Sequence, residues 1–228
     1  MTDGWTLWPA PAKLNLFLHV VGRRDDGYHL LQTVFQLLDW GDTVQLRVLP
    51  DGAIRSGAEV AGVPPEVDLT LRAAHALRQR SGCARGVEIR VGKCIPAGGG
   101  LGGGSSDAAT VLVALNELWA TRLSFDELAD IGLGLGADVP LFVRGHSAWA
   151  EGIGEKLTPI ELPRRHYVII DPRVSVATAP LFQAPELTRN SAKTTISNFL
   201  AGTKTTNAFA PVVRARFPPV AAALDWLG

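Results

Sequence analysis

A run of glycines near the middle of the chain is the feature that most restricts its fold. Residues 95–109 read IPAGGGLGGGSSDAA, with six glycines in seven positions. Glycine leaves backbone N–H groups unshielded by a Cβ atom, so such a run can curl around an anion. An amphipathic helix is predicted directly after the run, with Ser105 or Ser106 as its N-cap, and its N-terminus adds unpaired N–H groups. The pattern predicts a loop that binds the phosphates of a nucleotide.

Three other interpretations of the glycine run fit its surroundings less well. A flexible Gly/Ser linker is not expected between a strand-like segment, residues 87–91, and an amphipathic helix. A P-loop needs Gly-Lys-Ser or Gly-Lys-Thr after the glycines, and neither follows. Gly98, Gly100 and Gly103 match the dinucleotide fingerprint, but charged and apolar residues alternate in 87–91. That alternation predicts a half-solvated antiparallel strand, whereas the strands of a dinucleotide-binding fold are buried on both faces.

Charge and cysteine content limit the classes of function. The 22 basic side chains balance the 22 acidic ones over 228 residues, so no surface for nucleic acid or an anionic membrane is indicated. Cys83 and Cys94 have no CxxC partner and no neighbouring histidine, which predicts reduced thiols without zinc or a disulfide. The N-terminus lacks the regions of a secretory signal, and no run of about 18 apolar residues occurs. We expect a cytoplasmic globular protein, monomeric or homodimeric, without nucleic-acid or membrane partners.

Residue periodicities predict an α+β fold. Apolar residues alternate with others over 13–20, which predicts a half-buried strand whose polar face begins with Lys13 and Asn15. Further elements are predicted in chain order: strands at 30–38 and 43–49, a helix at 66–80, a helix that starts with a Ser124–Glu127 capping box and ends near Gly134, strands at 141–143, 147–151 and 157–162, and a short buried strand at 167–171. These elements follow no βαβ rhythm, which indicates α+β.

Four segments carry a resemblance to a known family: PAKLNLFL (11–18), GRRDDGYH (22–29), the glycine run, and LGADVPLFVRG (135–145). Together they resemble the GHMP kinases, named for galactose, homoserine, mevalonate and phosphomevalonate. Within that superfamily the DGYH segment and the GLGGGSS form of the loop are similar to the branch that acts on a cytidylylated methylerythritol, in the non-mevalonate isoprenoid pathway. The resemblance continues to at least Leu187, so it covers most of the chain.

The resemblance implies a two-domain α+β architecture. Residues 1–158 are expected to form an ATP-binding domain like the second domain of ribosomal protein S5, and residues 159–228 a ferredoxin-like domain. The family's third glycine-rich motif and closing strand–helix segment fall beyond Gly228, so we expect the second domain to be incomplete. ATP is implied as the phosphoryl donor, with the 2-hydroxyl of the methylerythritol as acceptor.

The resemblance also implies roles for individual residues. Lys13 and Asp138 match the family's catalytic lysine and aspartate. Tyr28, His29 and Phe182 match the positions that contact the cytosine, while Asn15 and Thr178 match positions near the polar middle of the substrate. The positions of the ATP loop are Pro96, Ala97, Gly98, Gly99, Gly100, Leu101, Gly102, Gly103, Gly104, Ser105 and Ser106. Mg²⁺ is expected with ATP, but Gly103 and Gly104 stand where most GHMP kinases have serines, so no metal ligand is carried over.

The chemistry of phosphoryl transfer agrees with these roles. The reaction needs positive charge at the phosphates and a carboxylate that accepts the proton of the attacking hydroxyl. Asp138 lies in a Gly-Ala-Asp-Val-Pro turn that holds its carboxylate rigidly, and a lysine within about 4–6 Å keeps such a carboxylate ionised. The residues alone leave other interpretations open: Asp138 as a helix cap, Lys13 as a solvated lysine, Tyr28 and His29 as turn residues, and Phe182 as a core residue.

Two other classes of function also stay open at the level of sequence. A dinucleotide-dependent oxidoreductase needs an acidic residue about 20 residues past the glycines, where residues 120–128 instead predict a turn and a helix start. An RNA-binding module is compatible with an S5-like fold, but the zero net charge argues against it.

Overall fold

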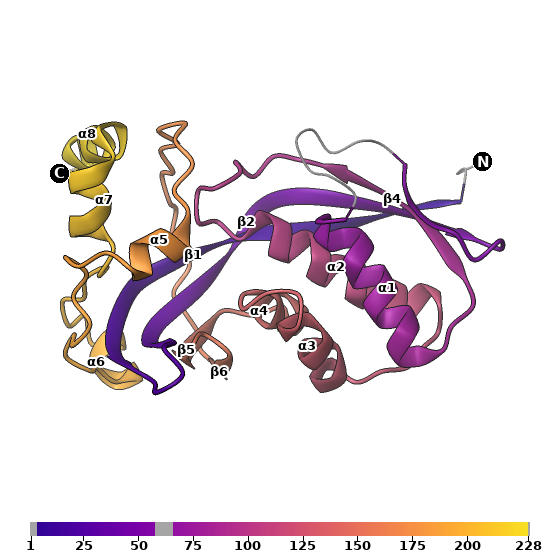
Figure 1. Ribbon diagram of the computed structural model, residues 1–228, viewed down its shortest axis with the longest axis horizontal. Coiled ribbons are helices and arrows are strands. Elements are labelled where there is room, and N and C mark those ends of the chain that lie inside the picture. Colours follow the sequence, from indigo (N-terminus) through magenta and orange to yellow (C-terminus); the bar gives the residue numbers. More distant parts are fainter. Residues whose placement is uncertain (1–3, 58–65, 228) are drawn as a thin grey trace. The chain divides into compact units, whose positions relative to one another are not determined.

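A computed structural model describes residues 4–57 and 66–227 of the chain (Figure 1). The chain divides into two compact units, the first formed by residues 1–12, 37–95 and 102–146, and the second by residues 13–36, 96–101 and 147–228. Both units mix strands with helices, which confirms the α+β class. The predicted domain limits, 1–158 and 159–228, remain a prediction. Among the described residues no helix is long and apolar enough to cross a membrane.

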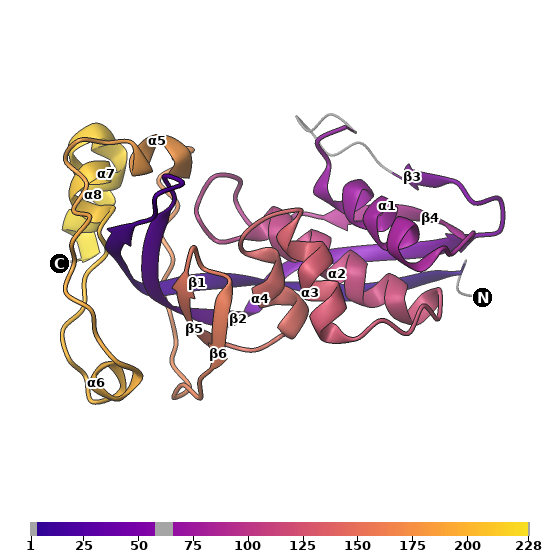
Figure 2. The same ribbon diagram turned by 60° about the horizontal axis from the view of Figure 1, so that its bottom comes forward.

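The first unit packs four helices against part of a sheet. In it, β2 (His29–Leu49) pairs antiparallel with β4 (Gly86–Gly92) through residues 43–49, and β3 (Ile54–Ser56) pairs parallel with β4. Figures 1 and 2 show α1 (Leu69–Ser81), α2 (Gly103–Leu118), α3 (Phe125–Leu133) and α4 (Val139–Arg144) on the same side of these strands. The centre of its hydrophobic core consists of fully buried side chains from strands and helices alike: Leu46, Leu77, Ile89, Leu112 and Leu115.

Local signals set the limits of these helices. Asp68 caps α1 by accepting a hydrogen bond from the Thr70 N–H, and Gly82 ends the helix with a φ of 70°. The predicted capping box of α3 is confirmed, because Ser124 and Glu127 accept hydrogen bonds from each other's backbone N–H groups. α1 and α3 therefore lie close to where their periodicities predict them.

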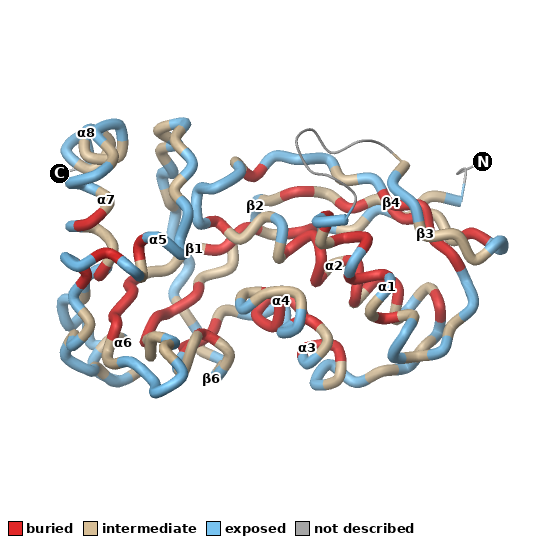
Figure 3. Tube along the Cα trace, viewed as in Figure 1, coloured by how far each residue is buried: buried red, intermediate tan, exposed pale blue. Residues whose placement is uncertain are grey.

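The second unit contains a hairpin and short helices. β5 (Ala148–Gly152) pairs antiparallel with residues 31–35 of β2 and with β6 (Lys156–Pro159), which confirms the predicted hairpin between 147–151 and 157–162. Four short helices complete the unit: α5 (Thr178–Phe182), α6 (Ile196–Leu200), α7 (Ala210–Arg216) and α8 (Pro218–Leu227). Among the described residues of this unit, apolar side chains form a small cluster around Phe17 and Trp149 and another around Leu181. Figure 3 shows that the residues of α6 and α8 are mostly intermediate or exposed.

The predicted break between the strands at 30–38 and 43–49 is wrong, since β2 is continuous from His29 to Leu49. Gly41 lies in the segment between the two predicted strands. A Cβ atom at Gly41 would lie 2.1 Å from the carbonyl oxygen of Ala10 in β1 (Trp5–Arg23). Gly41 therefore permits a close approach of two backbones and does not end the strand.

Two predicted strands are not strands. Residues 141–143 lie in α4, because Pro140 in its first turn favours a helix start and Gly145 ends the helix with a φ of 70°. Residues 167–171 have no regular structure, and Val168 is 75% exposed. Within the described part of the chain no strand pairs with that segment, so its backbone lacks the hydrogen-bonding partner that a strand requires.

The prediction of half-solvated strands is wrong for the central residues of β1 and β4. Lys13 is only 5% exposed and Glu88 only 8%. Each of these polar groups has a partner inside the protein, since Lys13 Nζ donates to Asn15 Oδ1 and Arg47 pairs with the Glu88 carboxylate. Alternation of polar and apolar residues did not distinguish a solvated face from a face with paired polar groups.

Candidate functional site

The glycine loop joins Ile95 to the start of α2 without regular structure. Gly98, Gly100 and Gly102 have φ angles of 75°, 72° and 77°, in the left-handed region that favours glycine. A Cβ atom at Gly98 would lie 2.2 Å from Ser175 Oγ, so the loop packs tightly against residues near 175 in the second unit. These glycines are required by backbone conformation and by space.

The predicted N-cap of α2 is wrong. Gly102 is the N-cap, and Ser105 and Ser106 lie inside the helix. The helix starts earlier because the left-handed Gly102 turns the chain directly into it. No side chain forms a cap hydrogen bond at this end of α2, so the first N–H groups of the helix are suited to an anion.

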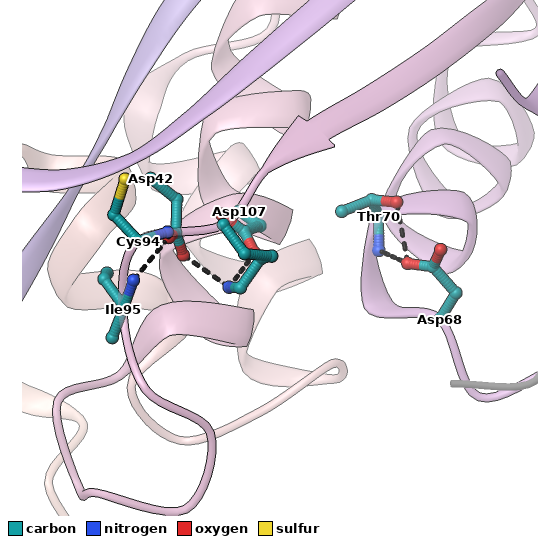
Figure 4. A network of polar contacts seen from close by, with 7 residues as sticks. Asp42, Asp68, Thr70, Cys94, Ile95 and Asp107 are labelled. Carbon is teal, nitrogen blue, oxygen red and sulfur yellow. Dashed lines mark hydrogen bonds and ion pairs between the residues drawn. The ribbon is translucent and has the colours of Figure 1, made fainter. Parts of the chain in front are cut away.

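A network of charged groups with two buried carboxylates lies where the glycine loop begins (Figure 4). Asp42 Oδ1 accepts hydrogen bonds from the backbone N–H groups of Cys94 and Ile95, and Asp42 Oδ2 accepts one from Lys93 Nζ. Lys93 Nζ also donates to Asp107 Oδ2 over 2.8 Å. Burial outweighs the hydrogen bond from Lys93 and raises the pKa of Asp107 to about 6. Burial lowers the pKa of Lys93, but its hydrogen bonds to Asp107 and Asp42 prevail and raise it.

Sequence reasoning missed this network. Asp42 lies in the short segment that the prediction left between two strands, and Lys93 lies just before the glycine run. A charged residue next to a glycine loop was the only available signal. The packing of strands and helices brings residues 42, 93 and 107 together. No local sequence pattern encodes that packing.

Lys13 and Asn15 form a buried polar chain on β1 in the second unit. Lys13 Nζ donates to Asn15 Oδ1 over 2.6 Å, and Asn15 Nδ2 donates to Thr33 Oγ1 over 3.0 Å. The two residues therefore share one face of the strand, as predicted. The Lys13 backbone N–H donates to the carbonyl of Leu101 over 3.0 Å, which ties the lysine to the glycine loop. With 5% exposure, Lys13 is not the solvated surface lysine of the alternative interpretation.

Asp138 occupies the N-cap position of α4 in the first unit. Its backbone angles, φ −86° and ψ −13°, lie outside the extended region usual for a cap, and its side chain forms no cap hydrogen bond. Helix capping therefore does not account for an aspartate at this position.

Two of the three residues predicted to contact cytosine lie together. The rings of His29 and Phe182 stack with centroids 5.0 Å apart and planes 20° apart. Arg189 Nε donates to His29 Nε2 over 3.1 Å, so the proton of the neutral ring lies on Nδ1. Burial, then the charges of Arg189 and Arg23, lower the pKa of His29.

Two other predicted substrate residues, Tyr28 and Thr178, are exposed. Tyr28 is 59% exposed in the turn before β2, and its N–H donates to Asp26 Oδ1 over 3.2 Å. Thr178 is the first residue of α5. Phe182 is half-buried, with its ring edge against Phe209 at a centroid distance of 4.9 Å.

Comparison with known proteins identifies close relatives. The family model described as "GHMP kinases N terminal domain" matches residues 68–146 of this chain. A 4-diphosphocytidyl-2-C-methyl-D-erythritol kinase of Xanthomonas campestris pv. campestris (strain B100) is 62% identical over 224 residues, which are 98% of this chain and 76% of that protein. A protein of the same name from Nitrosococcus oceani is 59% identical over 221 residues, or 97% of this chain and 79% of that protein.

Solved structures agree at the level of the fold. The crystal structure of a 4-(cytidine 5'-diphospho)-2C-methyl-D-erythritol kinase matches with a TM-score of 0.78 and 31% identity, over 96% of this chain and 81% of that one. A homoserine kinase from Cytophaga hutchinsonii matches with a TM-score of 0.55 and 18% identity, over 88% of this chain and 64% of that one. The second likeness concerns the fold alone.

Proposed function

Because the chain belongs to the 4-diphosphocytidyl-2-C-methyl-D-erythritol kinases of the GHMP superfamily, we propose that it phosphorylates the 2-hydroxyl of 4-diphosphocytidyl-2-C-methyl-D-erythritol. It is an ATP-dependent kinase. The single observation that carries the proposal is the glycine loop, in which three left-handed glycines lead directly into an α2 N-terminus without a side-chain cap. That arrangement suits the phosphates of ATP.

In this proposal the phosphates of ATP bind along residues 96–106. Backbone N–H groups of the loop and the positive end of the α2 dipole neutralise phosphate charge. Mg²⁺ would supply additional positive charge on the phosphate oxygens. The chemistry of the chain fits this ion, because it prefers oxygen ligands and the buried Ser106 Oγ has no hydrogen-bond partner among the described residues. Ser106 is therefore the residue that we propose to hold it.

Asp138 and Lys13 are the proposed catalytic residues. Asp138 accepts the proton of the attacking hydroxyl, since phosphoryl transfer requires a carboxylate that orients and deprotonates it. Lys13 orients the hydroxyl with its ammonium group. The burial of Lys13 and its bond to the loop residue Leu101 support a fixed position for that charge.

The cytosine is proposed to bind beside Tyr28, His29 and Phe182. The stacked rings of His29 and Phe182 support an aromatic site there, and the Nδ1–H of His29 can donate to an acceptor on the base. Asn15 and Thr178 are proposed to contact the polar middle of the substrate. The paired Asn15 amide supports a fixed orientation for that side chain.

A coupled assay of ADP release tests the function. The protein is incubated with ATP, Mg²⁺ and the cytidylylated methylerythritol, and in parallel with mevalonate, homoserine or galactose. We expect turnover with the cytidylylated substrate and background rates with the other three. Turnover with one of those three alone would assign the chain to another small-molecule kinase activity.

The physiological setting completes the proposal. The balanced charge supports an enzyme without nucleic-acid partners, and we propose a cytoplasmic location and a monomer or homodimer. Light scattering on the purified protein measures its mass in solution, and a larger assembly would contradict the proposed state.

A further inference from the structure

We propose that Asp42 and Lys93 are positioning residues that hold the two ends of the glycine loop in the conformation that binds ATP. This inference rests on the proposed role of the loop in ATP binding. Neither residue belongs to the loop, and the catalytic proposal uses neither. Both lie in the first unit, with the residues that begin and end the loop.

Asp42 fixes the start of the loop. Its side chain is fully buried, and one carboxylate oxygen accepts hydrogen bonds from the N–H groups of Cys94 and Ile95. Bonds from two successive N–H groups to one ionised oxygen orient both peptide planes. Ile95 is 4% exposed, so its side chain is anchored as well. The chain therefore enters the loop from a fixed direction.

Lys93 connects that start to the helix after the loop. Its ammonium group donates to Asp42 and to Asp107, which is the fifth residue of α2. A Cβ atom at Gly103 would lie 3.2 Å from Lys93 Nζ, so the lysine lies against the first residue of α2. One side chain thus joins β2, the segment before the loop and the helix after it.

Burying the carboxylates of this network costs free energy, which argues that the network has a role beyond packing. Charged groups lose hydration when they are buried, and apolar residues of similar volume often stabilise a fold as well or better. Asp107 Oδ1 is buried without a hydrogen-bond partner among the described residues. Directional bonds, unlike apolar contacts, fix the orientation of backbone groups.

A fixed pair of ends matters because the loop is rich in glycine. Ordering the backbone costs conformational entropy, and glycine loses more of it than any other residue. A loop whose ends are already held loses less entropy when ATP binds. Removing the network should therefore weaken ATP binding and leave the affinity for the second substrate nearly unchanged.

Asp42→Asn is the main variant. It is nearly isosteric and keeps one oxygen as acceptor, but it removes the charge and places an amide N–H₂ against Lys93 Nζ. We expect the ATP Kd and KM to rise about tenfold or more, because hydrogen bonds to charged groups are stronger than those between neutral groups. The KM for the cytidylylated substrate should change less than twofold. Isothermal titration measures the ATP Kd, and initial rates give both KM values and kcat.

Three further variants separate positioning from simple destabilisation. Asp107→Asn keeps an oxygen that can accept from Lys93, so its effect on the ATP Kd should be smaller than that of Asp42→Asn. The double variant Asp42→Asn/Lys93→Met should weaken ATP binding no more than the stronger single change, since both disrupt one network. Glu88→Gln is the matched control: it removes a buried carboxylate, paired with Arg47, on the same β4 strand that leads to Lys93. It should lower the melting temperature without changing the ATP Kd.

The variant Gly103→Val distinguishes a failure of the positioning role from a failure of the proposed ATP loop. A β-branched side chain at this position meets Ile95 and Lys93 within 3.2 Å and obstructs the start of α2, so it should weaken ATP binding strongly. If Gly103→Val leaves the ATP Kd unchanged, the proposed ATP loop is wrong. If Gly103→Val weakens binding but Asp42→Asn keeps the parent Kd, the positioning role is wrong. A parallel rise of both KM values in Asp42→Asn and Glu88→Gln would also overturn it.

Discussion

The two compact units of this chain differ in how firmly they hold the residues proposed for function. The first unit has a hydrophobic core that packs its sheet against four helices, and the buried carboxylates of Asp42 and Asp107 lie at the start of the glycine loop and in the helix after it. The described part of the second unit has smaller clusters, and its proposed cytosine residues lie in a turn, at the first residue of β2 and on a five-residue helix. The start of α2, which is proposed to bind phosphate, therefore rests on the larger core. The residues proposed to bind the base depend on a few local contacts.

Asp138→Asn should have the largest effect on activity. Asparagine is nearly the same size but cannot accept the hydroxyl proton, so kcat should fall by about 10²–10⁴. The ATP Kd and the melting temperature should stay near those of the parent, because asparagine is nearly isosteric with aspartate. Steady-state kinetics and calorimetry measure these quantities. Asp130→Asn, an exposed change on α3, is the control, and a parental kcat in Asp138→Asn would remove Asp138 from the mechanism.

Paired core truncations test the difference in packing between the units. Leu112 is fully buried in the core of the first unit, whereas Leu181 belongs to a small cluster of the second unit. Leu112→Ala should lower the free energy of unfolding by about 2–5 kcal/mol, and Leu181→Ala by about 2 kcal/mol or less because its site collapses more easily. Urea denaturation of both variants measures the losses. An equal loss of unfolding free energy in the two variants, or a larger loss in Leu181→Ala, would show that the second unit is packed as firmly as the first.

Tyr28→Ala tests the base-binding residues of the second unit. If Tyr28 stacks on the cytosine, its loss should raise the KM for the cytidylylated substrate by the equivalent of about 1–3 kcal/mol. The KM for ATP should not change. Tyr28→Phe keeps the ring and should retain the parent KM. A rise in the ATP KM alone would place Tyr28 on the nucleotide side.

The pH dependence of stability tests the charged network of the first unit. The pKa of Asp107 is raised from its ordinary value of 3.8 to about 6, so between these pH values the native protein binds a proton that the unfolded chain has released. The contribution of Asp107 to the free energy of unfolding therefore falls as the pH rises from about 4 to 6, by about 1–2 kcal/mol.

Asp107→Asn cannot titrate and should lack this fall. Lys93 and Asp42 face the same carboxyl and remain in the variant. Denaturation at several pH values between 4 and 7 measures the difference between parent and variant. Identical pH profiles would mean that Asp107 has an ordinary pKa.

The amino-acid sequence determined the features whose causes lie within a few neighbouring residues. The glycine loop, the Ser124–Glu127 capping box and the hairpin at 147–162 follow from glycine conformation, capping hydrogen bonds and alternation over short stretches. The family also follows from such segments, because its motifs are local. For these features the interactions that stabilise the structure are encoded next to one another in the chain.

Only the tertiary structure decided which distant residues become partners. It made β2 continuous by bringing Ala10 against Gly41, left residues 167–171 without a pairing strand, and enclosed Asp42 with Lys93 and Asp107. A polar residue in a strand has the same local pattern whether it faces water or a buried partner. The partner depends on contacts across tens of residues, and these exist only once strands and helices pack, because burial and pairing are properties of the folded chain.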